Sequence, residues 1–239
     1  MTELTDEAAA ALGGSSLTNL WLRGLTDLSP GAARGLAALK AAGNLGPTLR
    51  LDSLRSLSPE AAEAFAASNV TYLELIGLKT LSADTARALA AFKGDSLSLA
   101  GLVEPPAELA RLLPEFRCKT LSLHPWEWNL GRTRPVTSAD ARLLAAYARR
   151  LKKTCVLPGI AGLETPEAVE IARILADAPA SFSIPNLRLV SPRTLTVLIR
   201  NGNVELPPLD AIELVAEPDG SPTDDFVIPD DFPARGRRR

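Results

Sequence analysis

The sequence predicts an α/β fold in which short strand-plus-helix units stack into a solenoid, with a curved parallel sheet on the concave face and short helices on the convex face. Three observations lead to this prediction. Pairs of leucines recur at regular intervals, turn-forming residues follow each pair, and Ser-Pro or Thr-Pro dipeptides then precede alanine-rich stretches. Together they define one unit that returns along most of the chain.

The strand of each unit is predicted by a Leu-x-Leu pair. Alternate side chains of a strand point to the same face, so both leucines of a pair face the core. Leu20 and Leu22 are followed by leucines three and six residues further on, and the same offsets return from Leu49 and from Leu73. Less regular copies begin at Leu97, Leu121, Cys155, Phe182 and Val204. The periods between the eight copies are 29, 24, 24, 24, 34, 27 and 22 residues.

Turns and helix starts complete the unit. A glycine, serine, proline or asparagine stands two residues after each pair, and these residues favour the turn that ends a strand. A hydroxyl side chain followed by proline then predicts a helix start, because the hydroxyl caps the first turn and proline fits the first helical position. These dipeptides are Ser29-Pro30, Ser58-Pro59, Thr165-Pro166 and Ser191-Pro192.

This combination of strand, turn and alanine-rich helix resembles the leucine-rich-repeat family. The variant present here, with a leucine at the ninth position and a paired-alanine helix, is similar to the bacterial class called BspA-like. The resemblance covers about residues 17–212 and implies the solenoid described above. Because the repeat consensus is a packing rule, the resemblance implies no catalytic or ligand-binding residue.

The chain is predicted to divide into three segments. Residues 1–16 form a capping helix or partial repeat that covers the first strand, and residues 17–216 form the leucine-rich-repeat domain of about eight units. We expect the eight strands to form one parallel sheet. Residues 217–239 combine prolines with acidic and basic residues and are predicted to be a flexible tail.

Composition narrows the possible partners. A formal net charge of −2 gives no positive field for nucleic acid, and no apolar run approaches the roughly 18 residues that span a membrane. The acidic N-terminus lacks the basic start of a secretion signal, so we expect a cytoplasmic protein and a monomer. Cys118 and Cys155 have no metal-ligand spacing, and no cofactor motif is present.

Catalysis is not expected. His124 is the only histidine, and the strand alternation turns it outward while Cys155 points into the core, so the two do not form a nucleophile and base. We therefore expect a non-enzymatic module that binds another protein. Two alternatives remain: a structural spacer without a ligand site, and a cryptic enzyme that uses His124.

Two surfaces are candidates for the binding site. The first is the concave face of the first three units, where large and charged residues gather: Trp21, Arg23, Arg50, Asp52, Tyr72, Glu74 and Ile76. Later units present mostly small residues there, and exposed aromatic and arginine side chains are typical of interface hot spots. The alternative for this face is a solvated surface with no partner.

The second candidate is the insertion at residues 127–135, which carries Trp128, Arg132 and Arg134. An aromatic ring with guanidinium groups suits a carboxylate or a protein surface. The alternative is that Trp128 packs back against the core.

Overall fold

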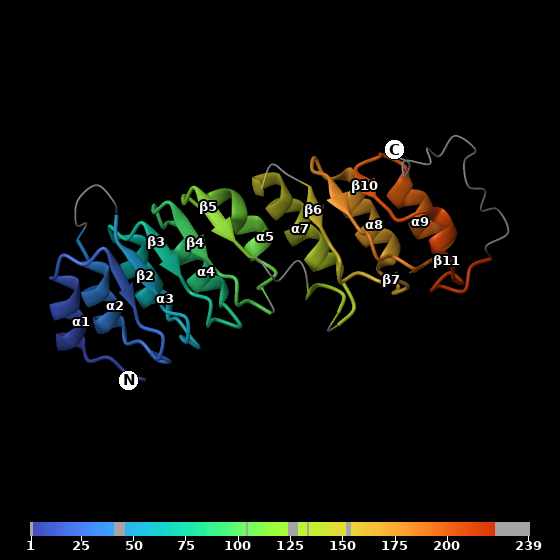
Figure 1. The fold of residues 1–239 in the computed structure, drawn as a ribbon. Helices are drawn as coiled ribbons and strands as arrows, with labels where there is room; N and C mark the ends of the chain where they lie inside the picture. Colours follow the sequence, from blue (N-terminus) through green and yellow to red (C-terminus); the bar gives the residue numbers. More distant parts are fainter. Residues whose placement is uncertain are drawn as a thin grey trace. The chain divides into compact units, whose positions relative to one another are not determined.

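The structure is a computed structural model that describes residues 2–40, 46–103, 105–123, 129–132, 134–151 and 154–222. It shows a mixed α/β chain of helices and parallel strands (Figure 1). The predicted α/β class with parallel pairing is confirmed. The chain forms two compact units, Met1–Trp126 and Glu127–Arg239, and each is described by itself.

The first unit contains one five-stranded parallel sheet in chain order. Its strands are β1 (Asn19–Trp21), β2 (Thr48–Arg50), β3 (Tyr72–Glu74), β4 (Ser96–Ser98) and β5 (Thr120–Ser122). Each strand lies where a Leu-x-Leu pair predicts one. The first leucines of the five pairs are Cα partners across the sheet, namely Leu20, Leu49, Leu73, Leu97 and Leu121. The sequence offsets therefore correspond to the pairing register.

The helices of the first unit follow one another along the sheet (Figure 1). They are α1 (Asp6–Gly13), α2 (Pro30–Ala37), α3 (Pro59–Ala66), α4 (Ala83–Ala90), the short α5 (Leu109–Leu112) and the 3₁₀ turn η1 (Leu113–Glu115). The hydroxyl groups of Ser29, Ser58 and Ser82 accept hydrogen bonds from the amide three residues later, at 2.9, 3.2 and 3.1 Å. The predicted capping of α2 and α3 is confirmed.

Leucine side chains fill the space between the sheet and the helices. Both leucines of the second, third and fourth pairs are fully buried. Leu20 and Leu22 of the first pair are only half-buried. The predicted N-terminal helix is present as α1, but it packs against α2. The N-terminal helix therefore covers the helix side of the first layer.

The contact between α1 and α2 depends on glycine. A Cβ atom at Gly13 would lie 1.8 Å from the carbonyl oxygen of Gly35, and a Cβ atom at Gly35 would lie 2.7 Å from the amide nitrogen of Ala10. The two helix backbones can therefore approach this closely only because both positions lack a side chain.

The second unit contains two three-stranded parallel sheets. One is formed by β6 (Cys155–Val156), β8 (Phe182–Ser183) and β10 (Val204–Glu205), and the other by β7 (Gly162–Leu163), β9 (Leu189–Val190) and β11 (Glu213–Leu214). Its helices are α7 (Ser138–Leu151), α8 (Ala168–Asp177) and α9 (Pro192–Ile199), with the 3₁₀ turn η2 (Leu209–Ala211). Cys155, Phe182 and Val204 are buried strand residues, as predicted.

One prediction about the sheets is wrong in the described residues, and three strands were not predicted. The eight predicted strands do not form one sheet, because β5 ends the first sheet and β6 begins another. Between these two strands stand the inserted segment and the 14-residue helix α7, so this interval is longer than any other. In addition, β7, β9 and β11 were not predicted. They are two residues long, which is too short for the alternation that identifies a strand.

The helix starts of the second unit also differ from the prediction. The helix expected at Thr165-Pro166 begins at Ala168, and the hydroxyl oxygen of Thr165 is buried without a hydrogen-bond partner. Helix α9 begins at Pro192 as predicted, but the hydroxyl of Ser191 pairs with that of Thr194. The amide of Arg193 donates instead to Oε1 of Glu217 at 2.8 Å.

Candidate functional site

The residues predicted for the concave site lie on β1, β2 and β3 and at the second position after each of these strands. Trp21, Arg50 and Glu74 are Cα partners, so their side chains form one row across three strands. Tyr72 belongs to the neighbouring row with Asn19 and Thr48. Because the leucines between these residues point into the core, the rows point away from it. We call Trp21, Arg23, Arg50, Asp52, Tyr72, Glu74 and Ile76 the N-terminal strand surface.

Trp21 is the largest exposed side chain of this surface. It is 52 % exposed, and the guanidinium carbons of Arg23 and Arg50 lie 5.0 and 5.4 Å from the centroid of its ring. These distances are within the range of cation–π attraction, which is about 0.5–1 kcal/mol at an exposed site. The arginines therefore restrain the indole ring in an orientation in which about half of it remains accessible.

Arg50 is held between two carboxylates. Its Nε lies 3.0 Å from Oε2 of Glu74, and its Nη2 lies 3.4 Å from Oδ2 of Asp52. The Nε–Glu74 contact is an ion pair whose N–H is not directed at the oxygen, and Oδ1 of Asp52 is buried without a hydrogen-bond donor. Two strand ends thus contribute to one cluster of an arginine and two carboxylates, in which hydrogen bonding is incomplete.

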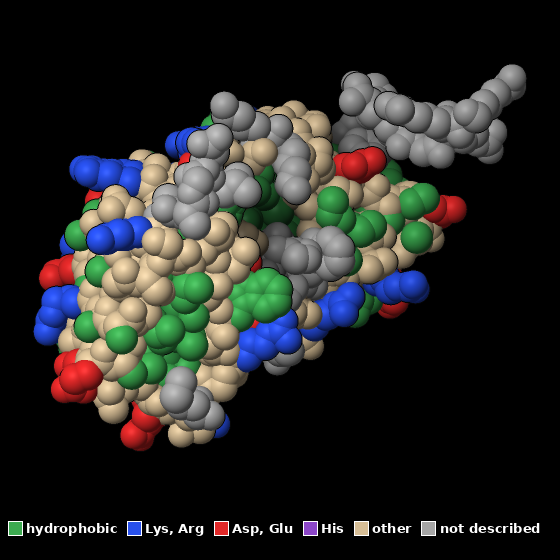
Figure 2. All heavy atoms as spheres, turned by 60° about the vertical axis from the view of Figure 1, so that its left-hand side comes forward, with side chains coloured by type: hydrophobic (Ala, Val, Ile, Leu, Met, Phe, Trp, Pro, Cys, Tyr) green, Lys and Arg blue, Asp and Glu red, His purple; other side chains and the backbone are tan. Residues whose placement is uncertain are grey.

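Arg23, Tyr72 and Ile76 complete the surface. Arg23 is exposed, and no carboxylate among the described residues forms an ion pair with it. Tyr72 is 40 % exposed and Ile76 is half-buried. In Figure 2, which brings the N-terminal end of the chain forward, hydrophobic side chains lie at the surface beside Lys and Arg side chains. The N-terminal strand surface therefore offers an indole ring, a phenol ring and a guanidinium group.

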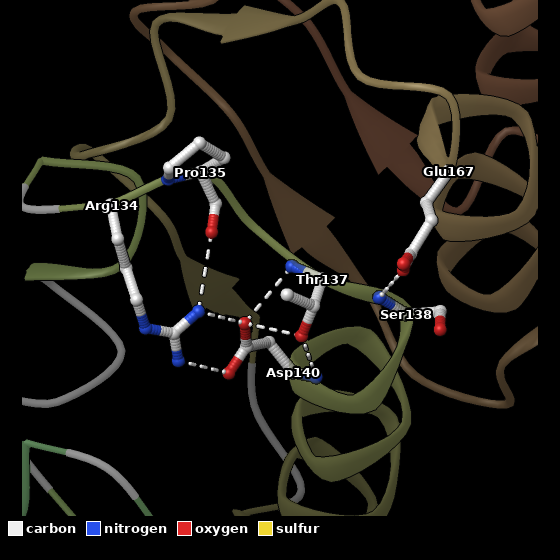
Figure 3. A network of polar contacts seen from close by, with 6 residues as sticks. All are labelled: Arg134, Pro135, Thr137, Ser138, Asp140 and Glu167. Carbon is white, nitrogen blue, oxygen red and sulfur yellow. Dashed lines mark hydrogen bonds and ion pairs between the residues drawn. The ribbon is translucent and has the colours of Figure 1, made fainter.

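Arg134 of the inserted segment pairs with a buried carboxylate at the start of α7 (Figure 3). Nη1 and Nη2 of Arg134 donate to the two carboxylate oxygens of Asp140 at 2.6 and 2.8 Å. The amide and the hydroxyl of Thr137 donate to Oδ2 of Asp140 at 2.9 and 2.8 Å. The Asp140 side chain is 6 % exposed. Arg134, which we predicted as a binding residue, is half-buried and pairs with Asp140 at the start of α7.

Hydrogen bonding controls the ionisation of Asp140. Burial disfavours the charged carboxylate, but the hydrogen bonds from Arg134 and Thr137 outweigh burial and hold the pKa of Asp140 below its ordinary value. A second carboxylate acts on the same helix start, because Oε2 of Glu167 accepts a hydrogen bond from the Ser138 amide at 2.7 Å (Figure 3). That hydrogen bond lowers the pKa of Glu167.

The other predicted residues of the insertion are divided. Arg132 is exposed, so it remains available to a partner. Trp128 lies outside the described residues. His124, the only residue that favoured an enzyme, also lies outside them, whereas the thiols of Cys118 and Cys155 are buried.

The parts of the chain that the structure describes contain an open depression but neither clustered metal ligands nor a membrane-spanning helix. No group of three or more His, Cys, Asp or Glu side chains there could hold a metal ion. Nor is any helix there both long and apolar enough to span a bilayer. An open depression along β7, β9 and β11 is lined by Glu164, Arg188 and Glu213, among others. Sequence reasoning missed it because it missed these strands.

Comparison with known proteins identifies no relative. The chain matches no protein-family model, and no curated protein is similar to it. The function must therefore be inferred from the geometry of the chain itself.

Proposed function

We propose that this protein is a leucine-rich-repeat solenoid and that its N-terminal strand surface binds another protein. Two observations support the repeat assignment. The leucines predicted to be equivalent are Cα partners through five strands, and the seryl caps recur at the starts of α2, α3 and α4. A unit of this kind buries its apolar face only against its neighbours, which is the physical basis of a solenoid.

The observation that carries the binding proposal is the exposed indole of Trp21 held by two arginines. Tryptophan and arginine are enriched among residues that dominate binding energy, and an aromatic ring that is already restrained loses little freedom on binding. The equivalent positions of β4 and β5 carry Ser98 and Ser122. Binding energy is therefore concentrated at β1 to β3.

Two other functions make different predictions. A structural spacer would bind only further copies of itself, and no surface residue would be specifically required. A cryptic enzyme would depend on His124, the only histidine of the chain, and substitution of His124 would abolish its activity. The insertion is the competing binding surface, with Trp128 and Arg132 as its contact residues.

Affinity capture tests the proposal, with the purified chain as bait and an extract of the organism that produces it as the source of partners. We expect one stoichiometric partner, and calorimetry with that partner made recombinantly should show that Trp21→Ala weakens binding by about 2 kcal/mol, or roughly thirtyfold. Tyr72→Ala should have a similar effect. Both substitutions should lower the melting temperature much less than loss of a core leucine, because the two side chains are 52 % and 40 % exposed.

A matched control lies in the second unit. Val156 on β6 is an apolar strand residue with 41 % exposure, and Val156→Ala should leave the affinity unchanged. If Trp128→Ala or Arg132→Ala abolishes binding while Trp21→Ala does not, the insertion is the binding site. Recovery of the chain alone, as an assembly of copies, would favour the spacer.

A further inference from the structure

Strand β1 has an open edge. Among the described residues it pairs only with β2: the Thr48 amide donates to the Thr18 carbonyl at 2.8 Å, and the Leu22 amide donates to the Arg50 carbonyl at 3.0 Å. Backbone groups of alternate residues in a strand point to opposite sides. Since residues 18, 20 and 22 face β2, the N–H and C=O groups of Asn19 and Trp21 face the open edge.

The first layer of the core is incomplete on the same side. Leu20 and Leu22 are half-buried, although their counterparts Leu49 and Leu51 are fully buried between neighbouring strands and helices. Helix α1 packs against α2 and therefore covers the helix side of this layer. Figure 2 shows hydrophobic side chains at the surface of this forward end. The first layer has a capping helix, and no described strand covers β1.

One arginine beside the open edge lacks a carboxylate partner. Asp52 and Glu74 both pair with Arg50, whereas no carboxylate among the described residues forms an ion pair with Arg23. Proteins protect exposed edges with lysine, proline or bulges, because a free edge recruits another strand. The sequence Asn-Leu-Trp of β1 contains no such residue.

We propose that the open edge of β1 binds an extended segment of a partner protein in which acidic and apolar residues alternate. The segment adds to the sheet as a further strand and hydrogen-bonds to the backbone of Asn19 and Trp21. Its apolar side chains cover Leu20 and Leu22. Its carboxylates lie on the side of the sheet that carries Trp21, where they pair with Arg23. The inference rests on the proposed function and names the chemistry of the partner's contact segment.

The probe for this proposal is a blocked hexapeptide of alternating valine and glutamate, with a valine–lysine hexapeptide as its control. Hydrogen exchange followed by NMR supplies the first measurement. In the free protein the amides of Leu20 and Leu22 should be protected and those of Asn19 and Trp21 should exchange freely. The valine–glutamate peptide should protect Asn19 and Trp21, and the valine–lysine peptide should not. Free exchange at Asn19 and Trp21 in saturating acidic peptide would overturn the proposal.

Two substitutions separate the charge from the backbone contact. Arg23→Ala should weaken peptide binding about tenfold, because a charge-assisted hydrogen bond is lost, and Arg23→Lys should restore part of it. Asn19→Pro removes an amide that faces away from β2 and should weaken binding about fivefold or more at unchanged melting temperature. Val156→Ala is the control, because Val156 lies on β6 in the second unit and not on β1 or the strand beside it.

N-methylated peptides test strand addition without altering the protein. One peptide is methylated on the valine amides and the other on the glutamate amides, so each removes the donors on one side of the added strand. Alternate amides of the added strand face β1. In a parallel addition these are the valine amides, so only the valine-methylated peptide should lose binding. In an antiparallel addition they are the glutamate amides, so only the glutamate-methylated peptide should lose binding. Equal affinities of both methylated peptides would overturn the proposal.

The outcomes for the two proposals are distinguishable. One outcome is that binding of the captured partner requires Trp21 and Tyr72 while the amides of Asn19 and Trp21 still exchange freely. In that case the partner binds the N-terminal strand surface, and the proposal of strand addition is wrong. If the peptides bind as described but no partner depends on Tyr72, the edge is a binding site and the wider surface is not.

Discussion

Adjacent residues of β3 occupy opposite environments. Leu73 is fully buried, while Tyr72 before it is 40 % exposed. This difference follows from the alternation of a strand, in which one face joins the core and the other faces solvent. Substitutions one residue apart should therefore affect different properties: the buried face should control stability, and the exposed face should control binding.

Within β3 and β4, stability should respond mainly to the leucine face. Leu75→Ala should lower the free energy of unfolding by about 2–5 kcal/mol, because the cavity left by a fully buried leucine is not refilled. Leu75 is fully buried between neighbouring layers, whereas Ser98 lies on the opposite face of the sheet. Urea unfolding checks the prediction with Ser98→Ala as the control, which should cost less than about 0.5 kcal/mol. Equal midpoints of the two variants would contradict the assignment of faces.

The alternation also explains which site residues could be predicted from the sequence. The exposure of Trp21 and Tyr72 follows from the position of each beside a core leucine. The pairing of Arg134 with Asp140 could not be predicted, because Arg134 lies in a non-repeating segment whose course depends on tertiary contacts. The same holds for Glu217, which caps a helix that begins 25 residues earlier in the chain.

At the scale of elements, the close approach of α1 and α2 should be sensitive to a single methyl group. Gly13→Ala places a Cβ atom 1.8 Å from the Gly35 carbonyl oxygen, so the helices must separate. We expect a loss of about 1–3 kcal/mol of stability. Gly14→Ala is the matched control, since its Cβ atom would be 3.4 Å from its nearest neighbour, an ordinary contact. Thermal unfolding that shows the same loss for both variants would contradict this packing.

The anchor of the inserted segment should depend on pH. The pKa of Asp140 is lowered in the folded protein, so its ion pair with Arg134 contributes stability above the unfolded-state pKa of about 4. This contribution is lost as the pH falls through the lower, folded-state pKa. The difference in urea midpoint between the wild type and Asp140→Asn should therefore be largest near pH 7 and shrink below about pH 4.

The control for this prediction is Asp84→Asn. Asp84 forms an ion pair with Arg87 at the surface, and an exposed pair of this kind contributes little at any pH. If the Asp140→Asn difference stayed constant from pH 7 to pH 3, ionisation of Asp140 would not be the source of the stabilisation.

Turns between strand and helix show a second regularity at this scale. A Cβ atom at Gly101 would lie 1.7 Å from the Ile76 carbonyl oxygen of the preceding turn. Where serine or asparagine replaces glycine, the side chain donates a hydrogen bond to the preceding turn: Ser53 to the Arg23 carbonyl, and Asn186 to the Pro158 carbonyl. The sequence predicts a turn at each position, but only the structure shows that successive turns contact each other.

For the whole molecule, local signals predicted the elements better than the sheets. Leu-x-Leu pairs and seryl caps located β1 to β5, α2 and α3, because each depends on a few adjacent residues. The extent of a sheet depends on pairing between segments more than 20 residues apart in the sequence. The 34-residue interval between the pairs at Leu121 and Cys155 indicated an insertion, but not that β5 would end a sheet.

The end of the described chain provides the last prediction. The sequence predicts a flexible tail from residue 217, yet Glu217 is 5 % exposed and accepts the Arg193 amide at the start of α9, and Asp219 pairs with Arg193 at 3.0 Å. A chain shortened after Pro222 should keep the melting temperature of the full chain. A chain shortened after Ala216 loses a helix cap of about 1–2 kcal/mol, which corresponds to a melting temperature about 2–6 °C lower.

Two full-length variants show whether the cap is the cause. Glu217→Ala should reproduce the lower melting temperature, because the Arg193 amide loses its acceptor. Glu205→Ala is the control, since Glu205 on β10 is exposed. If truncation after Pro222 lowers the melting temperature as much as truncation after Ala216, residues beyond 222 stabilise the protein and the predicted tail does not exist. Calorimetry of the four proteins decides between these outcomes. The carboxylate that caps α9 accounts for the loss only if truncation after Ala216 lowers the melting temperature and truncation after Pro222 does not.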